Sequence, residues 1–357
     1  MLVTELLKLS VSSQDRSALL ETMTACNAAA NHAAHLAHAA GTASKVRVQK
    51  MCYHELKATH GLGAQMAILA VHKACGALAR DKKKLPVFRE HGAIAYDPRI
   101  SSWKARDEVS LLTVRGRIRV RVLYQGRWAK AHPERIRGQM DLVYREGNFY
   151  LAVVTDVPEP PEGGEPATWL GADFGLANLA ADSDGNTYCG KAVRAVRYRN
   201  RMLRQKLQKK GTRSAKRLLR KRRRTEERFA RNTNHVISKA LVGTAQRTGR
   251  GIALEDLKGI RERVTVRRAQ RADHHAWAFG QLRSFVEYKA RLAGVPTTAV
   301  DPRNTSRTCP ECGHVDKKNR PTRDWFCCLR CGHAGPADTI AAVNIRGRAV
   351  SHAANAA

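Results

Sequence analysis

Residues 168–181 read TWLGADFGLANLAA, an apolar run that contains a single acidic side chain, Asp173. Short apolar runs bounded by turn signals are typical of buried strands. The run predicts one strand up to Asp173 and a second over 177–181, and the Asp-Gly pair at 184–185 predicts a turn into a third. We therefore expect a meander with an acid inside its first strand.

Two further acids stand at the ends of predicted elements. Residues 251–257, GIALEDL, predict a buried strand that ends in acid, with Glu255 closing its apolar part. An amphipathic helix at 275–293 and a short strand at 297–300 follow, and Asp338 begins a helix that runs to about 347. Strands that alternate with helices predict an α/β fold.

The three acids, Asp173, Glu255 and Asp338, form a candidate catalytic set. Buried carboxylates are costly unless a cation compensates their charge. Two divalent ions about 3.5–4 Å apart would do so, and they would catalyse the attack of water on a phosphodiester. Because oxygen ligands of this kind suit Mg²⁺ or Mn²⁺, the set predicts these ions as cofactors.

Each acid also has a structural explanation. Asp338 could cap a helix, Glu255 could pair with basic residues elsewhere, and Asp173 could be a turn residue. Asp256 rivals Glu255 for the site, but neighbours on a strand face opposite sides, so only one of the two can join it. Four other acids lie in turn-like surroundings and are interpreted as structural: Asp182, Asp184, Asp301 and Asp324.

The charge of the chain indicates its partner. The 357 residues include 64 Lys and Arg against 31 Asp and Glu, a formal net charge of +33. Such a field attracts polyanions, so nucleic acid is the expected partner. A membrane is not expected, because no stretch approaches the ~20 apolar residues of a spanning helix. The first residues, MLVTELLKLSVSS, lack the apolar core of a secretory signal.

The basic charge is concentrated in residues 191–231, which hold 19 Lys and Arg and two Glu, a net charge of +17. Leu203, Leu207, Leu218, Leu219 and Phe229 are spaced so that a helical hairpin turning near Gly211 could pack one side. A solvated charged hairpin is the alternative, but such a charge density would repel itself without a polyanion. The candidate nucleic-acid contacts are Arg201, Arg204, Lys206, Lys209, Lys210, Arg213, Lys216, Arg217, Arg220, Lys221, Arg222, Arg223 and Arg224.

Five of the nine cysteines fall within residues 309–331, in the arrangement CPEC at 309–312 and CLRC at 328–331. Two CxxC turns complete a tetrahedron of sulfur around one zinc ion. Four sulfur ligands leave no open position, so Cys309, Cys312, Cys328 and Cys331 predict one structural Zn²⁺. Cys327 lacks the required spacing. The remaining cysteines show no pairing pattern, which favours a reducing, cytoplasmic compartment.

The first half of the chain changes character twice. Residues 1–12 predict one strand, 13–84 two or three helices, and 85–156 several strands. Residues 118–122, IRVRV, predict a half-buried strand with a positive outer face, and residues 142–154 predict a hairpin. We expect a small β-barrel, a fold that often binds oligonucleotides. Its aromatic residues could stack on bases or pack in the core: Trp103, Tyr124 and Trp128.

Three segments resemble the RuvC motifs of TnpB proteins, the transposon-encoded ancestors of type V CRISPR effectors: GADFGLANLA at 171–180, IALEDL at 252–257 and ADTIAAVNI at 337–345. The segments TSRTCPECGH at 305–314 and FCCLRCGH at 326–333 are similar to the family's zinc ribbon. The helix that carries Arg231, Asn234, His235, Ser238 and Lys239 also fits. The resemblance covers roughly residues 168–347. Ile340 and Phe174 depart from the family pattern, but neither change removes a ligand.

The resemblance implies a multi-domain chain. A RuvC nuclease domain of the RNase H-like fold would comprise residues 168–304 and 334–347, with the basic hairpin at 191–231 inserted. A zinc ribbon at 305–333 and a flexible tail at 348–357 would complete this half. A wedge-like β-barrel at 1–12 and 85–156, interrupted by a helical recognition lobe at 13–84, would precede a linker at 157–167.

The function implied is that of an RNA-guided DNA endonuclease from a transposable element. A guide RNA and target double-stranded DNA would be the partners, and base pairing would read the sequence while the protein reads a short adjacent motif. Three alternatives stay open: an RNA-guided regulator with little cleavage, a compact CRISPR-associated type V effector, and a transposase accessory protein. A homodimer also stays open, and the expected location is the prokaryotic cytoplasm, in association with the nucleoid.

Overall fold

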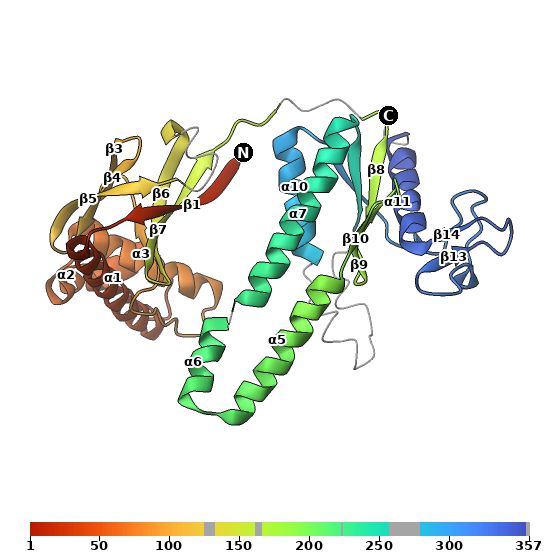
Figure 1. Ribbon diagram of the computed structural model, residues 1–357. Helices are drawn as coiled ribbons and strands as arrows, with labels where there is room; N and C mark the ends of the chain where they lie inside the picture. The colour runs from red at the N-terminus through yellow and green to blue at the C-terminus, as the bar shows by residue number, and fades with distance from the viewer. Residues whose placement is uncertain (125–132, 161–165, 223, 257–278, 355–357) are drawn as a thin grey trace. The chain divides into compact units, whose positions relative to one another are not determined.

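The computed structural model describes residues 1–124, 133–160, 166–222, 224–256 and 279–354 (Figure 1). The chain forms two compact units, Met1–Pro158 and Glu159–Ala357. The division between them falls inside the proline-rich segment 157–167, where we expected a linker. Trp128 and Arg223, which the sequence analysis names as candidates, lie outside the described residues.

The first unit contains a seven-stranded antiparallel sheet with the order β2-β6-β7-β1-β5-β4-β3. The sheet curves so that its edge strand β2 comes near β4. A hydrogen bond joins the two strands, since the Tyr96 hydroxyl donates to the Leu112 carbonyl oxygen at 2.8 Å. Arg145 pairs with Asn148, which confirms the predicted hairpin. The strands are β1 (Leu2–Ser10), β2 (Ile94–Tyr96), β3 (Ser101–Ala105), β4 (Glu108–Thr113), β5 (Gly116–Leu123), β6 (Ile136–Arg145) and β7 (Asn148–Asp156).

Three helices, α1 (Ser13–Ala39), α2 (Lys45–His60) and α3 (Ala64–Arg80), share one core with this sheet. In β5 the side chains of Val120 and Val122 are buried while Arg119 and Arg121 are exposed, so the predicted alternation is confirmed. Trp103 and Tyr124 are partly buried and pack against the core. Core packing, the alternative to base stacking, therefore accounts for both rings.

The second unit contains a five-stranded mixed sheet with the order β10-β9-β8-β11-β12. Strand β9 is antiparallel to both of its neighbours, β8 and β10, which confirms the predicted meander. Strand β11 is parallel to both β8 and β12. The strands are β8 (Trp169–Asp173), β9 (Asn178–Asp182), β10 (Thr187–Cys189), β11 (Gly251–Glu255) and β12 (Thr297–Val300).

Helices cover both faces of this sheet (Figure 1). On one face Leu170 packs with Leu241 of α7 (Thr225–Arg247) and Val286 of α10 (Phe279–Ala293). On the other face Trp169 packs with Ile345 and Ala349 of α11 (Ala337–Ala354). This contact corrects the predicted tail at 348–357: burial of Ala349 against Trp169 continues the helix to Ala354.

Gly171 allows α11 to lie directly on β8. A Cβ atom at this position would lie 2.0 Å from the Ala342 carbonyl oxygen and 2.8 Å from the Arg346 nitrogen, both backbone atoms of α11. Only glycine fits this approach, so the glycine two residues before Asp173 brings the start of α11 close to the end of β8.

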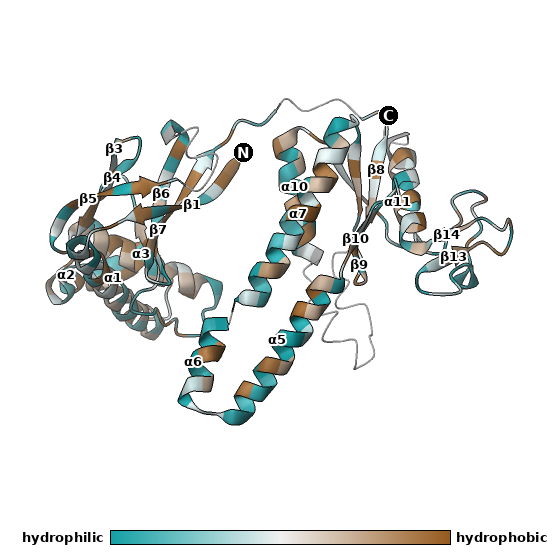
Figure 2. Ribbon diagram, in the orientation of Figure 1, coloured by the Kyte–Doolittle hydropathy of each residue, from teal (hydrophilic) through white to brown (hydrophobic). Residues whose placement is uncertain are grey.

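The basic tract forms α5 (Lys191–Lys210) and α6 (Arg213–Arg222), joined at Gly211, whose φ is 63°. Figure 2 shows hydrophilic residues along both helices. Leu207 is buried and Leu203 and Leu219 are half-buried, but Leu218 and Phe229 are 38% and 37% exposed. The predicted packing is thus only partly correct, because α6 is short and contributes little apolar surface.

The cysteine-rich segment, residues 305–336, holds two short paired strands, β13 (Trp325–Cys327) and β14 (Ala334–Pro336). Its small core of Cys309, Phe326 and Cys328 includes Ala337 and Ile340 of α11. Across the part of the chain that is described, none of the helices combines the length and the apolar character required to cross a membrane.

Candidate functional site

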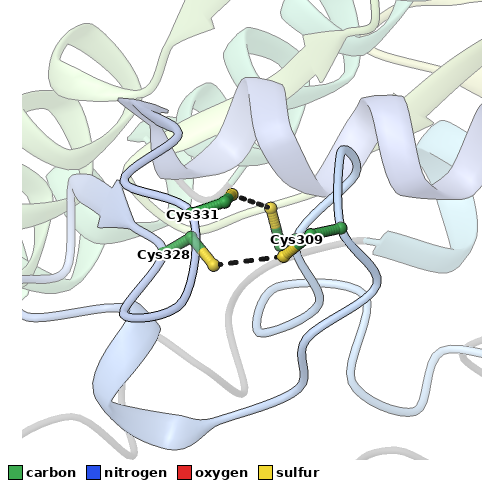
Figure 3. A group of neighbouring side chains, drawn as sticks. Cys309, Cys328 and Cys331 are labelled. Carbon is green, nitrogen blue, oxygen red and sulfur yellow. Dashed lines mark hydrogen bonds between the residues drawn. The ribbon is translucent and has the colours of Figure 1, made fainter.

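The four predicted zinc ligands come together. The sulfur atoms of Cys309, Cys312, Cys328 and Cys331 all lie within 4.8 Å of one another. The Sγ atoms of Cys309 and Cys331 are 3.5 Å apart, as are those of Cys312 and Cys328, and Figure 3 shows the labelled thiols turned toward one another. A cluster of four thiols fits a structural zinc site, in which each position of the tetrahedron is filled by sulfur.

Two tight turns build this cluster. The backbone nitrogen of Cys309 donates to the His314 carbonyl, and that of Cys328 donates to the His333 carbonyl, at 2.9 and 2.8 Å. Gly313 and Gly332 adopt φ values of 68° and 74°, in the left-handed region that glycine favours. Glycine after each second cysteine is thus required by the turn itself.

The structure also brings the three predicted carboxylates together. Asp173 ends β8 and Glu255 ends the adjacent parallel strand β11, where Leu254 pairs with Ala172. Asp338 is the second residue of α11, which packs on β8. Burial, followed by the charges of Glu255 and Asp338, raises the pKa of Asp173 to about 8. The site therefore concentrates negative charge that its surroundings only partly compensate.

Glu255 is held by a hydroxyl group from the segment before the first cysteine. The Thr305 hydroxyl donates to Glu255 Oε1 at 2.5 Å. Thr305 is itself fixed from α11, since the buried Asn344 amide donates to the carbonyl oxygens of Thr305 and Thr308, at 2.7 Å each. Burial raises the pKa of Glu255, although the bond from Thr305 opposes the shift.

Asp256, the rival of Glu255, is held elsewhere. Its Oδ1 atom lies 3.1 Å from Nη1 of Arg283, a residue of α10. The same nitrogen donates to the Glu255 carbonyl oxygen at 3.1 Å, so Arg283 fixes the backbone at the end of β11. The contact of Asp256 with α10 is consistent with the alternation expected along a strand.

Both carboxylate oxygens of Asp338 have partners. Arg320 of the cysteine-rich segment lies 3.2 Å from Oδ1, and the Asn178 amide donates to Oδ2 at 3.0 Å. Because α11 begins at Ala337, Asp338 is inside the first turn, and the helix-cap explanation does not hold. The turn explanation for Asp173 also fails, since this residue pairs with Ala181 in the sheet.

Three of the acids interpreted as structural have partners of their own. Asp182 accepts bonds from the backbone nitrogens of Asp184 and Asn186, at 3.1 and 2.9 Å. Asp184 pairs with Arg250, and Asp301 pairs with Arg303. The contacts of Asp182 and Asp301 close turns, as the sequence predicted, whereas Asp184 reaches a residue 66 positions later in the chain.

Four residues of the site were missed in the sequence: Thr305, Asn344, Asn178 and Arg320. The first three lie inside the segments that carry the family resemblance, but nothing in their local pattern marks them as partners of an acid. Arg320 is one of 64 basic residues and had no distinguishing signal. Each acts across a long separation in sequence, which only the folded chain reveals.

The basic hairpin offers an exposed cationic surface. All of its candidate contacts that the structure describes are exposed: Arg201, Arg204, Lys206, Lys209, Lys210, Arg213, Lys216, Arg217, Arg220, Lys221, Arg222 and Arg224. Glu226 pairs with Arg197 and Arg204, at 3.7 and 3.6 Å. One carboxylate neutralises little of the charge of this surface. The surface is therefore complementary to a polyanion.

Parts of this chain are similar in sequence to known proteins. The family described as Cas12f1-like, TNB domain matches residues 279–345. The CRISPR-associated endodeoxyribonuclease Cas12f1 of Sulfoacidibacillus thermotolerans is 38% identical over 118 residues, which is 33% of this chain and 26% of that protein. A TnpB-like protein of Methanocaldococcus jannaschii is 31% identical over 175 residues, 46% of this chain and 62% of that protein. The chain thus spans less than two thirds of the length of either relative.

The fold has a solved counterpart. The cryo-EM structure of a Cas12f1-sgRNA-target DNA complex matches 94% of this chain and 83% of its own, with a TM-score of 0.65 and 16% identity. At this identity the match concerns the fold, which is a mixed α/β, multi-domain arrangement. Together with the sequence matches, it shows that the chain is a relative of the TnpB-like proteins and the type V effectors of the Cas12f group.

Proposed function

We propose that the chain is an RNA-guided DNA endonuclease of a transposable element, with Asp173, Glu255 and Asp338 as the catalytic residues of a RuvC site. The observation that carries the proposal is the proximity of these three carboxylates: Asp173 and Glu255 end adjacent parallel strands, and the charges of Glu255 and Asp338 add to burial in raising the pKa of Asp173. The proposal is supported by the relative named as an endodeoxyribonuclease. The sheet of β8 to β12 with helices on both faces would be its RNase H-like core.

The donor set fits two divalent cations. Carboxylate oxygens are hard ligands that suit Mg²⁺ or Mn²⁺. Crowded acids with raised pKa values are also those that a bound cation would stabilise in the charged form. When bound by Asp173, Glu255 and Asp338, two such ions would supply an activated water and would neutralise the charge that develops on the phosphodiester.

Other residues of the chain would position these acids. The Thr305 hydroxyl orients Glu255 Oε1, and the Asn178 amide orients Asp338 Oδ2. Arg320 places a fixed positive charge beside Asp338. We propose that one structural Zn²⁺, bound by Cys309, Cys312, Cys328 and Cys331, holds the segment that provides both Arg320 and the packing against the start of α11.

The proposed partners are a guide RNA and target double-stranded DNA. The net charge of +33 and the exposed hairpin supply binding to phosphates without sequence preference. Base pairing with the guide would then supply the sequence preference. We assign target-motif recognition to the first unit, with residues 1–12 and 85–156 as its wedge-like barrel and 13–84 as its recognition lobe.

Plasmid cleavage tests the proposal. The chain would be purified together with the RNA that it retains, the RNA would be sequenced, and a supercoiled plasmid carrying the matching target would be incubated with the complex and Mg²⁺. We expect linear product from the wild type and none from Asp173→Asn. Asp301→Asn, which changes an acid paired with Arg303 outside the site, is the matched control and should cut normally. A wild type that binds RNA and target but does not cut would contradict the proposal and favour the regulator alternative.

A further inference from the structure

Helices α7 and α10 carry an aromatic cluster at the surface of the second unit. The rings of His235 and Phe285 are stacked, with centroids 4.0 Å apart and planes inclined by 20°. Tyr288 meets Phe285 edge-on at 5.8 Å, and all three rings are half-buried. Val236, next to His235, is 60% exposed. The cluster thus presents apolar ring surface to solvent.

Positive charge surrounds these rings. Arg231, His235 and Lys239 are spaced four residues apart on α7, so they share one face of the helix. Arg231 and Lys239 are exposed, and among the residues that the structure describes neither has an acidic partner. The charge of Arg231 acts to lower the pKa of both His235 and Tyr288, so Arg231 lies beside the cluster.

Lys289 completes the cluster from α10. Its ammonium group lies 5.9 Å from the Phe285 ring centroid and 6.0 Å from that of Tyr288. The same group donates to the His235 carbonyl oxygen at 2.7 Å and to the Ser238 hydroxyl at 2.6 Å, which locks α10 against α7. The rings are therefore held in a fixed arrangement, as a preformed binding surface requires.

His235 is suited to stacking in its neutral form. Burial, followed by the charges of Lys289 and Arg231, lowers the pKa of its imidazole. A neutral ring at neutral pH presents a π face without an additional charge. The surface thus combines three aromatic rings with cations at its border, the combination that binds unpaired bases with little sequence preference.

The same helix also reaches the candidate nuclease site. Arg283, two residues before Phe285, donates to the carbonyl oxygen of Glu255 at 3.1 Å. We propose that His235, Phe285 and Tyr288, with Arg231, Lys239 and Lys289, form a stacking surface for unpaired bases of single-stranded DNA. The choice of DNA as the occupant rests on the proposed function.

Binding of a fluorescent oligonucleotide tests this inference. The full zinc-loaded chain with its retained RNA would be titrated, in buffer free of Mg²⁺ and Mn²⁺ and without a chelator, with single-stranded DNA containing 2-aminopurine, whose emission is quenched when the base stacks. Phe285→Leu keeps an apolar side chain but removes the flat ring, and we expect affinity to fall by roughly tenfold, with loss of the quenching. Tyr288→Leu should act in the same direction, and Lys239→Ala should lower the salt dependence of binding by about one phosphate contact without removing the quenching.

The matched control is Tyr188→Leu, which removes another half-buried tyrosine of the second unit, on β10, outside the cluster and the basic hairpin. It should leave the titration unchanged. Thermal unfolding checks that each variant is folded, and Tyr288→Leu replaces Phe285→Leu if the latter is not. Unchanged affinity and quenching in a folded variant would overturn the inference, as would a stronger effect on an RNA probe of the same sequence. Because cleavage is not expected without Mg²⁺ or Mn²⁺, these outcomes are independent of plasmid cutting, whose failure would contradict the proposed function alone.

Discussion

Replacing Thr305 by valine isolates the contact that orients Glu255. Valine has nearly the same shape as threonine but cannot donate to Glu255 Oε1, which is 2.5 Å from the Thr305 hydroxyl. Thr305 is only 4% exposed, so water cannot readily replace the lost donor. A hydrogen bond to a charged group contributes about 1.5–3 kcal/mol. Since about 1.4 kcal/mol corresponds to tenfold, the affinity of the site for divalent cations should fall about 10- to 100-fold, the range typical of residues that orient a metal ligand.

The assay follows plasmid cleavage as a function of Mn²⁺ concentration, together with calorimetric titration of Mn²⁺ into the protein. Thr305→Val should raise the half-saturating Mn²⁺ concentration while the KM for DNA stays the same, and Thr305→Ser, which keeps the hydroxyl, should restore the wild-type Mn²⁺ dependence. Thr308→Val is the matched control, because the Thr308 hydroxyl lies three residues away and donates only to the Asn304 carbonyl. Equal Mn²⁺ dependence in Thr305→Val and wild type would refute the role of this hydroxyl.

Three further predictions concern the acids, the cysteines and the hairpin. In metal-free protein the folded state retains a proton on Asp173 that the unfolded chain loses, since the pKa is raised from 3.8 to about 8. The free energy of unfolding should therefore fall as pH rises through this window, and the pH dependence measured by urea denaturation should be weaker in Asp173→Asn. Cys309→Ser should release zinc, measured by elemental analysis, and lower the thermal midpoint; a variant with full zinc content and stability would contradict the structural role. Arg217→Ala and Lys221→Ala together should lower the slope of log affinity against log salt by about 1–2 for RNA, and an unchanged slope would show that this part of the hairpin does not contact phosphates.

The local sequence pattern was sufficient to predict several strands and the two cysteine turns. The apolar runs around Asp173 and Glu255 predicted buried strands because each face of these strands meets a helix. The two CxxC turns predicted the thiol cluster because the spacing and the following glycines set the geometry of each turn. The order of strands in each sheet is instead a property of the whole chain, and no local pattern determined it.

The residues that position the acids depend on long-range contacts. Thr305 meets an acid 50 residues earlier in the chain, and Asn344 holds the Thr305 carbonyl from 39 residues away. The end of α11 was misjudged for the same reason. Small residues after 347 predict fraying by themselves, but Ala349 packs against Trp169 from the first strand of the sheet.

The number of Mn²⁺ ions bound to zinc-loaded protein tests the central claim most directly. Electron paramagnetic resonance would count bound Mn²⁺ in the wild type, in Asp173→Asn and in the control Asp301→Asn. The three-carboxylate site predicts two ions in the wild type and in Asp301→Asn, and loss of both or of the tighter one in Asp173→Asn. Equal Mn²⁺ binding in the wild type and Asp173→Asn would contradict the account, because it would show that these carboxylates do not form the metal site.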